Sequence, residues 1–198
     1  MQASLEHSSV IRRFYRTIGS RSRPLTSVGR VIVCGAAVAL GATIVSYIVG
    51  LRLNLTGSIP PGVYVVTQEP IARRTIVMAC LPSMASAFAR SRGFVPSGYC
   101  HDGSAPIGKT VAAIAGDTVD VTPVGIAVNG RLLPNSRALT VDSEDRPLRA
   151  FPFGRFLVGS DQVWLVSSYS SRSFDSRYFG PVPIDGIITS IRPVFVAR

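Results

Sequence analysis

Lysine and histidine are almost missing from this chain of 198 residues. Lys109 is the one lysine among 21 basic residues, and the two histidines are His7 and His101. Cysteine is also scarce, with three in the chain. Because a zinc site normally takes four Cys, His or carboxylate ligands at close spacing, the sequence predicts no metal site and no cofactor.

The positive charge is placed unevenly. The formal net charge is +10, and residues 1–30 carry six arginines against Glu6 alone, whereas 14 basic residues face 10 acidic ones after Arg52. We find no basic stripe interleaved with aromatic residues, so nucleic-acid binding is not expected. The N-terminal excess is instead typical of a topology signal, with attraction to anionic lipid headgroups as a secondary role.

A long uncharged, apolar segment fills residues 31–51, between Arg30 and Arg52. About 20 apolar residues suffice to cross a bilayer, so the segment predicts a transmembrane helix. The alternative is a cleaved secretory signal, whose apolar core normally has only about 7–15 residues. We therefore predict a basic cytoplasmic tail over 1–30, one span over 31–51 and an exported domain over 52–198.

The cysteines fit an exported domain. Cys34 falls inside the predicted span and is interpreted as a small packed apolar residue. Cys80 and Cys100 fall in the exported part, where an oxidising compartment permits a disulfide. Two free thiols are the alternative.

Short runs of β-branched and apolar residues, separated by Gly, Pro, Asn and Asp, predict a mainly β exported domain. One soluble helix is expected over Ser83–Arg92, where Ser83 can cap the first turn and Gly93 can end the helix. Residues 135–149 are polar and charged, which is typical of a surface excursion. Strands are expected at Val63–Thr67, Thr75–Ala79, Thr110–Ile114, Thr118–Thr122, Gly125–Val128, Arg155–Val158, Gln162–Ser167 and Ile187–Phe195.

A serine shortly after the predicted span has an unusual setting. Ser58 follows Gly57 and precedes, after Ile59, the run Pro60–Gly62. Proline and glycine hold such a turn in a constrained, exposed conformation that can present a hydroxyl to a substrate. The same pattern also describes a simple turn residue.

The single lysine lies in an apolar stretch, Pro106 to Ile114, that is expected to run beneath the surface. Arginine cannot be deprotonated in a protein, whereas a desolvated lysine loses its proton readily. A neutral buried amine can take the proton of a serine hydroxyl without any histidine. An arginine-rich composition is the alternative reason for the scarcity of lysine. A Ser-His-Asp triad is not supported, because His101 sits in a polar turn and His7 precedes the span.

Three segments then occur in a fixed order over about 125 residues: the serine segment 57–64, the lysine segment 108–119 with its Gly-Asp turn, and a Ser-x-Asp-Ser-Arg box at 173–182. In this order they resemble the type I signal peptidase family, peptidase family S26. The serine setting, Asn-x-Thr-x-Ser-x-Pro-x-Gly after one span, is more similar to the TraF-like branch of conjugative-transfer propilin peptidases. The resemblance implies a mostly β, signal-peptidase-like catalytic domain whose serine lies close to the bilayer.

The resemblance also implies roles for individual residues. Ser58 corresponds to the nucleophile and Lys109 to the general base. Ser173 matches the serine that orients the lysine amine. Asp175 and Arg177 match a pair that braces the site, and in TraF-like enzymes the aspartate is held to be needed for activity. A simple salt bridge is the alternative for that pair.

Stabilisation of an oxyanion is expected from the backbone N–H of Ser58 and the hydroxyl of Thr56, although Thr56 can also serve only as a turn cap. One departure concerns the segment ahead of the last box. Many signal peptidases have Gly-Asp-Asn-Arg where this chain has Ser167–Ser170, so no role is transferred to these positions.

The implied activity is serine endopeptidase cleavage of leader peptides from exported precursors, and for the TraF-like branch the substrate is a propilin. The expected partners are the precursor, membrane lipid and other components of a conjugative transfer apparatus. A general type I signal peptidase and an inactive membrane-anchored scaffold of a secretion apparatus are the alternatives. The expected place is the inner membrane, with one span and a periplasmic catalytic domain.

We expect the N-terminal tail to stay in the cytoplasm and the domain after the span to face the periplasm, because short basic flanks are retained inside. Alkaline phosphatase fused after Arg198 should therefore be active, and the matched fusion after Arg30 should be inactive. An inactive fusion after Arg198, in cells that produce it at full length, would contradict this topology.

Overall fold

The computed structural model describes residues 26–197, so most of the predicted cytoplasmic tail lies outside the described residues. The chain divides into two compact units, the first ending at Ile44 and the second beginning at Val45.

The apolar helix α2 spans Ser27–Ile48 and has no buried residue. It is long and apolar enough to cross a membrane by length and composition. A helix that is apolar all round suits a lipid environment, because it has no polar face to turn toward water. The helix covers most of the predicted span of 31–51 and ends before its last three residues. Gly50 has a φ of 75°, and Leu51 already pairs with Val65 in a strand.

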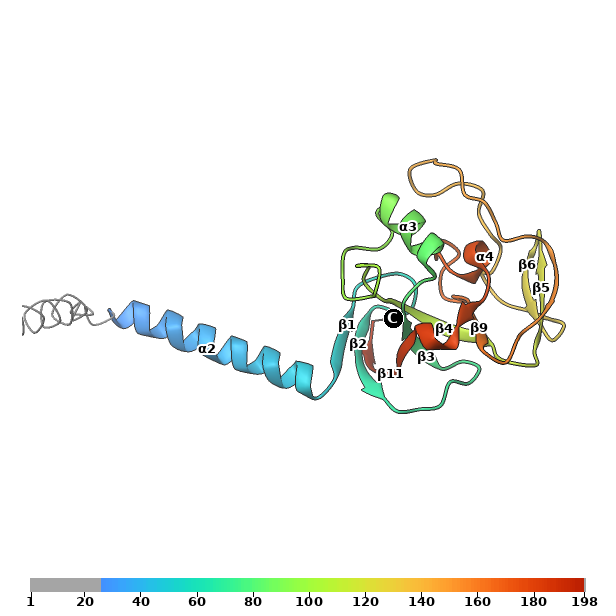
Figure 1. Cartoon of the computed structure of the whole chain (residues 1–198). Coiled ribbons are helices and arrows are strands. Elements are labelled where there is room, and N and C mark those ends of the chain that lie inside the picture. Colours follow the sequence, from blue (N-terminus) through green and yellow to red (C-terminus); the bar gives the residue numbers. More distant parts are fainter. Residues whose placement is uncertain (1–25, 198) are drawn as a thin grey trace, which may run out of the picture. The chain divides into compact units, whose positions relative to one another are not determined.

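The second unit is mainly β, as the sequence predicted. A seven-stranded antiparallel sheet has the order β1-β2-β11-β3-β4-β9-β10, and a four-stranded sheet has the order β7-β6-β5-β8. In Figure 1, β5 and β6 lie at the far end of this unit from β1 and β2. The strands are β1 (Leu51–Asn54), β2 (Gly62–Thr67), β3 (Ile76–Ala79), β4 (Ile107–Ala113), β5 (Thr118–Thr122), β6 (Gly125–Val128), β7 (Arg131–Leu132), β8 (Gly154–Leu157), β9 (Gln162–Leu165), β10 (Val182–Pro183) and β11 (Ile187–Val196).

The eight predicted strands are confirmed, β5 and β6 with the predicted bounds and the other six with shifted ends. The short strands β1, β7 and β10 were not predicted. The predicted soluble helix is α3 (Ser83–Ser91), but its predicted cap is wrong. Pro82 occupies the N-cap position, and no side chain caps the helix. Gly93 follows the helix with a φ of 71°, the conformation expected of a glycine that ends one. A short helix, α4 (Ser176–Phe179), was missed.

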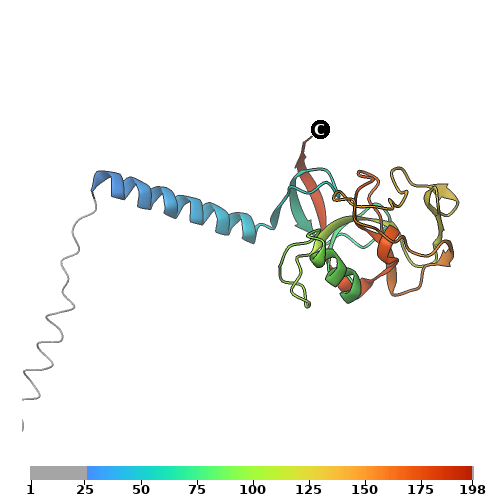
Figure 2. The ribbon, with the colours of Figure 1, turned by 90° about the horizontal axis from the view of Figure 1, so that it is seen from above.

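The last strand, β11, lies between two strands from the start of the domain. It pairs with β2 on one side and with β3 on the other, and Figure 2 shows its C-terminal end beside β1 and β2. Gly62 opens β2 where β11 passes closest. A Cβ at that position would overlap the backbone of Phe195, so the close pairing requires glycine.

Strand β9 lies between two hydrophobic cores. Val163 and Leu165 pack into the core of the large sheet, whereas Trp164 and Val166 pack into the core of the small sheet. This follows from the alternation of side chains along a strand. Because both faces of β9 are buried, the residue that follows Val166 is held firmly in place.

Cys80 and Cys100 form a disulfide with a Cα–Cα distance of 5.7 Å. Cys80 follows β3, and Cys100 lies in the loop between α3 and β4. The disulfide therefore ties the sheet to the loop that runs into the lysine strand.

We expect this disulfide to form in the exported protein and to stabilise it by roughly 3 kcal/mol, because it restricts the unfolded chain. Alkylation without reductant should leave Cys80 and Cys100 unmodified, and a Cys80→Ala/Cys100→Ala variant should unfold at lower denaturant concentration. Full labelling of both thiols in native, unreduced protein is the result that would refute the pairing.

Candidate active site

The fold brings Ser58 and Lys109 together from positions 51 residues apart in the sequence. The Nζ atom of Lys109 lies 2.5 Å from the Oγ atom of Ser58. It also lies 2.7 Å from the Oγ atom of Ser173. Lys109 is only 2% exposed, whereas Ser58 is partly exposed. The partly exposed Ser58 hydroxyl is therefore hydrogen-bonded to the buried Lys109 amine.

Strand β4 buries the lysine because of its place in the alternation. Lys109, Val111 and Ala113 share the buried face of the strand. Gly108 removes a side chain next to the lysine, and a Cβ there would come within 3.0 Å of the Cδ1 atom of Ile59. The glycine therefore lets the turn that carries Ser58 approach β4 closely.

Asn54, at the end of β1, organises the turn that contains the serine. Its Nδ2 atom lies within hydrogen-bonding distance of the carbonyl oxygens of Thr56, Ile59 and Pro60, at 3.0–3.2 Å. Its Oδ1 atom accepts the Thr56 hydroxyl at 2.7 Å. Sequence reasoning gave Asn54 no role of its own, although it stands in the Asn-x-Thr-x-Ser pattern.

Burial lowers the pKa of Lys109 to about 8. The carboxylate of Asp175 favours the charged amine and so opposes this shift, whereas the guanidinium of Arg177 adds to it. A charged Lys109 donates to the hydroxyls of Ser58 and Ser173. A neutral Lys109 keeps a lone pair that can accept the proton of Ser58.

Asp175 and Arg177 form an ion pair in which both residues are at most 1% exposed. The Nε and Nη2 atoms of Arg177 donate to the carboxylate at 2.8 and 2.7 Å. Asp175 also caps α4 by accepting the backbone N–H of Arg177. In the described part of the chain, Asp175 makes no hydrogen bond to Ser58 or Lys109, so it acts on the pair through its field and through the backbone that it holds.

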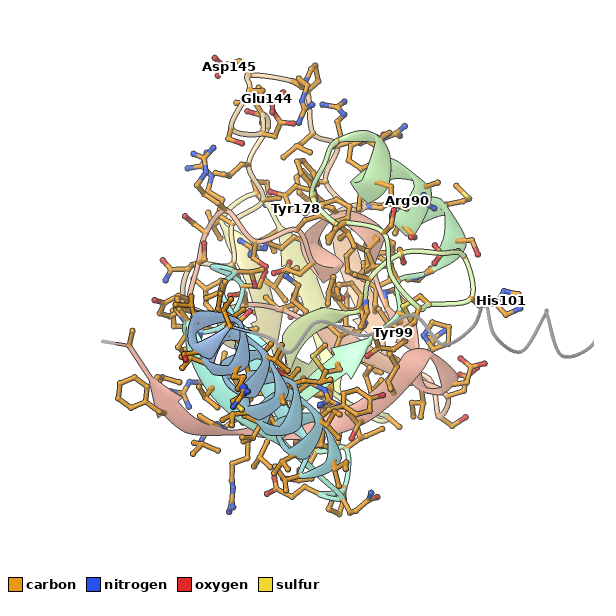
Figure 3. All side chains as sticks on the ribbon, turned by 90° about the vertical axis from the view of Figure 1, so that its left-hand side faces the viewer. Arg90, Tyr99, His101, Glu144, Asp145 and Tyr178 are labelled. Atoms are coloured by element: carbon orange, nitrogen blue, oxygen red, sulfur yellow. A yellow bond between two sulfur atoms is a disulfide. The ribbon has the colours of Figure 1, made fainter. Side chains whose placement is uncertain are left out.

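Thr56 and His101, both considered in the sequence analysis, are exposed. Thr56 is exposed, and its hydroxyl donates to Asn54, so it must rotate before it can serve a developing oxyanion. His101 is exposed on the loop after Cys100 and lies at the edge of the molecule in Figure 3. Among residues 26–197, no group of three or more His, Cys, Asp or Glu side chains could hold a metal ion.

Sequence reasoning missed Ser167, which directly follows the buried residue Val166. Its hydroxyl donates to the backbone carbonyl of Ser58 at 2.6 Å, and its N–H donates to Asp175 at 2.9 Å. The only signal in the sequence is the departure from the Gly-Asp-Asn-Arg pattern, where a hydroxymethyl side chain stands in place of the hydrogen of glycine.

Comparison with known proteins shows the family of this chain. The family model for "Signal peptidase, peptidase S26" matches residues 26–196. A "Plasmid transfer protein TraF" of Escherichia coli is 38% identical over 176 residues, which cover 88% of this chain and 98% of that protein. A "Conjugal transfer protein TraF" of Agrobacterium tumefaciens (strain 15955) is 41% identical over 165 residues, covering 81% of this chain and 92% of that one. A signal peptidase I structure from Enterococcus faecalis V583 covers 63% of this chain and 98% of its own, with 17% identity and a TM-score of 0.35.

The single lysine makes its titration directly observable. We expect the native Lys109 amine to titrate with a pKa of about 8, because its burial penalises the charged form. Protein labelled with ¹³C at lysine Cε should give one side-chain signal that shifts through this pH.

The pH dependence of stability provides a second test of the same pKa. Between about pH 8 and the ordinary lysine pKa of about 10.4, the unfolded chain binds more protons than the native one, so the free energy of unfolding should rise with pH over that window. A Lys109→Met variant is the control, since it lacks this rise. A native signal that titrates near 10.4 contradicts the prediction.

Proposed function

This chain belongs to the signal peptidase family S26, and we propose that it is a membrane-anchored serine endopeptidase that cleaves leader peptides with a Ser58/Lys109 dyad. The observation that carries the proposal is the contact between a buried amine with a lowered pKa and a partly exposed serine hydroxyl. A structural ion pair would explain a buried lysine, but it would not place a serine oxygen at its amine.

Proton transfer in this mechanism begins from neutral Lys109. Its amine takes the proton of the Ser58 hydroxyl while the oxygen attacks the scissile carbonyl carbon. The resulting ammonium then gives this proton to the leaving amine nitrogen as the acyl-enzyme forms. In the second half of the reaction, the amine takes a proton from a water molecule as the water oxygen attacks the ester carbon. The bond from that carbon to Ser58 Oγ then breaks, and the ammonium returns the proton to the Ser58 oxygen. Ser173 accepts from the amine throughout and fixes its direction.

Negative charge develops on the carbonyl oxygen of the substrate during both attacks. The backbone N–H of Ser58 can donate to it, and the Thr56 hydroxyl can donate once it leaves the Asn54 amide oxygen. Removing one such donor commonly lowers kcat by about 10²–10³. The exposed position of Thr56 leaves it free to rotate.

The proposed place of cleavage is the outer face of the inner membrane. Only about ten residues separate the end of α2 at Ile48 from Ser58, at most roughly 35 Å of extended chain. The site would then meet a substrate that is itself tethered to the bilayer. The names of the relatives, a plasmid transfer protein and a conjugal transfer protein, support a role in conjugation. We therefore infer that the precursor is a propilin and that it is cut after a residue with a small side chain.

A general signal peptidase that acts on many precursors is the second candidate, because the family description itself is that broad. Growth of a host depleted of its own signal peptidase distinguishes the two, since only a general enzyme restores it. An inactive scaffold is disfavoured by the contact between Lys109 and Ser58, which serves no evident structural purpose.

The dyad predicts that Lys109→Arg abolishes precursor cleavage as fully as Ser58→Ala. Arginine keeps the positive charge but cannot release its proton, and positioned proton transfer is typically worth about 10²–10⁴ in rate. Cleavage of a propilin in detergent or proteoliposomes, assayed by the mass of the products, measures the effect. Equal protease resistance of all three proteins is the control. A folded Lys109→Arg protein that cleaves near the wild-type rate removes the mechanism.

A further inference from the structure

Ser167 connects two parts of the site that are otherwise far apart in the sequence. It follows the buried strand β9 and is 1% exposed. Its backbone N–H donates to Oδ2 of Asp175 at 2.9 Å, and its Oγ lies 2.6 Å from the carbonyl oxygen of Ser58. One buried residue thus contacts both the ion pair and the backbone of the nucleophile.

The hydrogen-bond partners fix the direction of the Ser167 hydroxyl. Its oxygen accepts the backbone N–H groups of Tyr169 and Ser170, at 3.2 and 3.1 Å. A hydroxyl has one proton and two lone pairs, and a backbone carbonyl can only accept. With both lone pairs engaged, the proton must point at the carbonyl of Ser58.

This bond gives the nucleophile turn an anchor on the lysine side of the site. Asn54 and the Tyr64 hydroxyl bond the turn 56–60 from nearby in the chain. Within the described residues, hydrogen bonds to this turn from beyond residue 64 come from Lys109 and Ser167. The Lys109 contact is the reactive one and changes during catalysis. Ser167 is the anchor that can stay constant.

We propose that Ser167 is a positioning residue, which uses its hydroxyl to hold the Ser58 backbone so that the Ser58 Oγ stays at bonding distance from the Lys109 amine. The inference rests on the proposed dyad for its effect on cleavage. The chain of contacts runs from the Arg177–Asp175 pair through the Ser167 backbone to Ser58.

Loss of the hydroxyl has two consequences. The turn gains freedom to move away from β4, which lowers the share of molecules with Ser58 in position to react. Water also gains access to Lys109, which weakens the desolvation of its amine. The charged residues that act on this amine are Asp175 and Arg177, and neither is altered by removing the Ser167 hydroxyl.

The experiment compares Ser167→Ala with Ser168→Ala, a matched control at an exposed neighbour, and with Ser167→Thr, which restores a hydroxyl. Ser167→Ala should lower kcat for propilin cleavage by about 10- to 100-fold, the size of effect that slight misplacement of a reacting group produces. KM should stay close to wild type, because buried Ser167 does not reach the substrate. Ser168→Ala should cleave normally, and Ser167→Thr should recover much of the lost rate.

The titration of the single lysine provides a readout that does not need activity. In Ser167→Ala, the ¹³Cε signal of Lys109 should titrate at a higher pH than in wild type and in Ser168→Ala. Loss of global stability alone would not move this native-state pKa. Should Ser167→Ala fail to fold, Ser167→Cys carries the test, since a thiol occupies a similar place but is only a weak donor.

The outcomes separate this inference from the proposed function. Wild-type protein that cleaves no precursor, together with a raised lysine pKa in Ser167→Ala, would sink the proposed function and keep the positioning role. Unchanged kcat and an unchanged lysine titration in folded Ser167→Ala would overturn the positioning role and leave the dyad intact.

Discussion

The buried ion pair between Asp175 and Arg177 is the constraint on which the rest of the site depends. Burying both charges carries a desolvation cost of several kcal/mol per ion, and only close geometry and further hydrogen bonds offset it. Here the guanidinium is fully engaged. It also donates to the backbone carbonyls of Asn135, Arg137, Ser170 and Ser171. The pair thereby fixes the start of the 135–149 excursion and the segment that leads to Ser173. Figure 3 shows Glu144 and Asp145 at the outer tip of that excursion.

The amine of Lys109 owes its low pKa to burial rather than to one neighbouring charge. Asp175 and Arg177 act on it in opposite directions, so their pairing keeps the carboxylate from restoring an ordinary pKa. An aspartate alone at this depth would hold the lysine charged. The ion pair thus braces the site mechanically and also limits the electrostatic effect of its own carboxylate. This accounts for an aspartate beside a lysine that acts as a base in the proposed mechanism.

The turn that carries Ser58 is held from several directions by small features of the sequence. Gly108 provides room for Ile59 against β4, and Asn54 bonds three carbonyls of the turn. Ser167 adds a hydrogen bond to the carbonyl oxygen of Ser58. None of these residues reacts, yet each restricts where the hydroxyl can lie, and proximity of this kind is a large part of what a catalytic site supplies. These contacts restrict the Ser58 hydroxyl to one position, although its turn lies at the surface.

The sequence by itself determined the features that depend on neighbours along the chain. Short runs of β-branched and apolar residues between turn residues predicted eight strands, and the uncharged apolar segment predicted α2. The one lysine in an apolar stretch pointed to β4. Only the tertiary structure decided which residues meet. The order of the large sheet sets the register that brings Lys109 to Ser58, and the double burial of β9 places Ser167 under the nucleophile turn. Strands β7 and β10 were missed because two residues carry too little pattern, and β1 was missed because its first residue, Leu51, was assigned to the predicted span. The alternation of side chains is a local property, whereas a contact across 51 or 109 residues depends on sheet order and register, which no short stretch of sequence encodes.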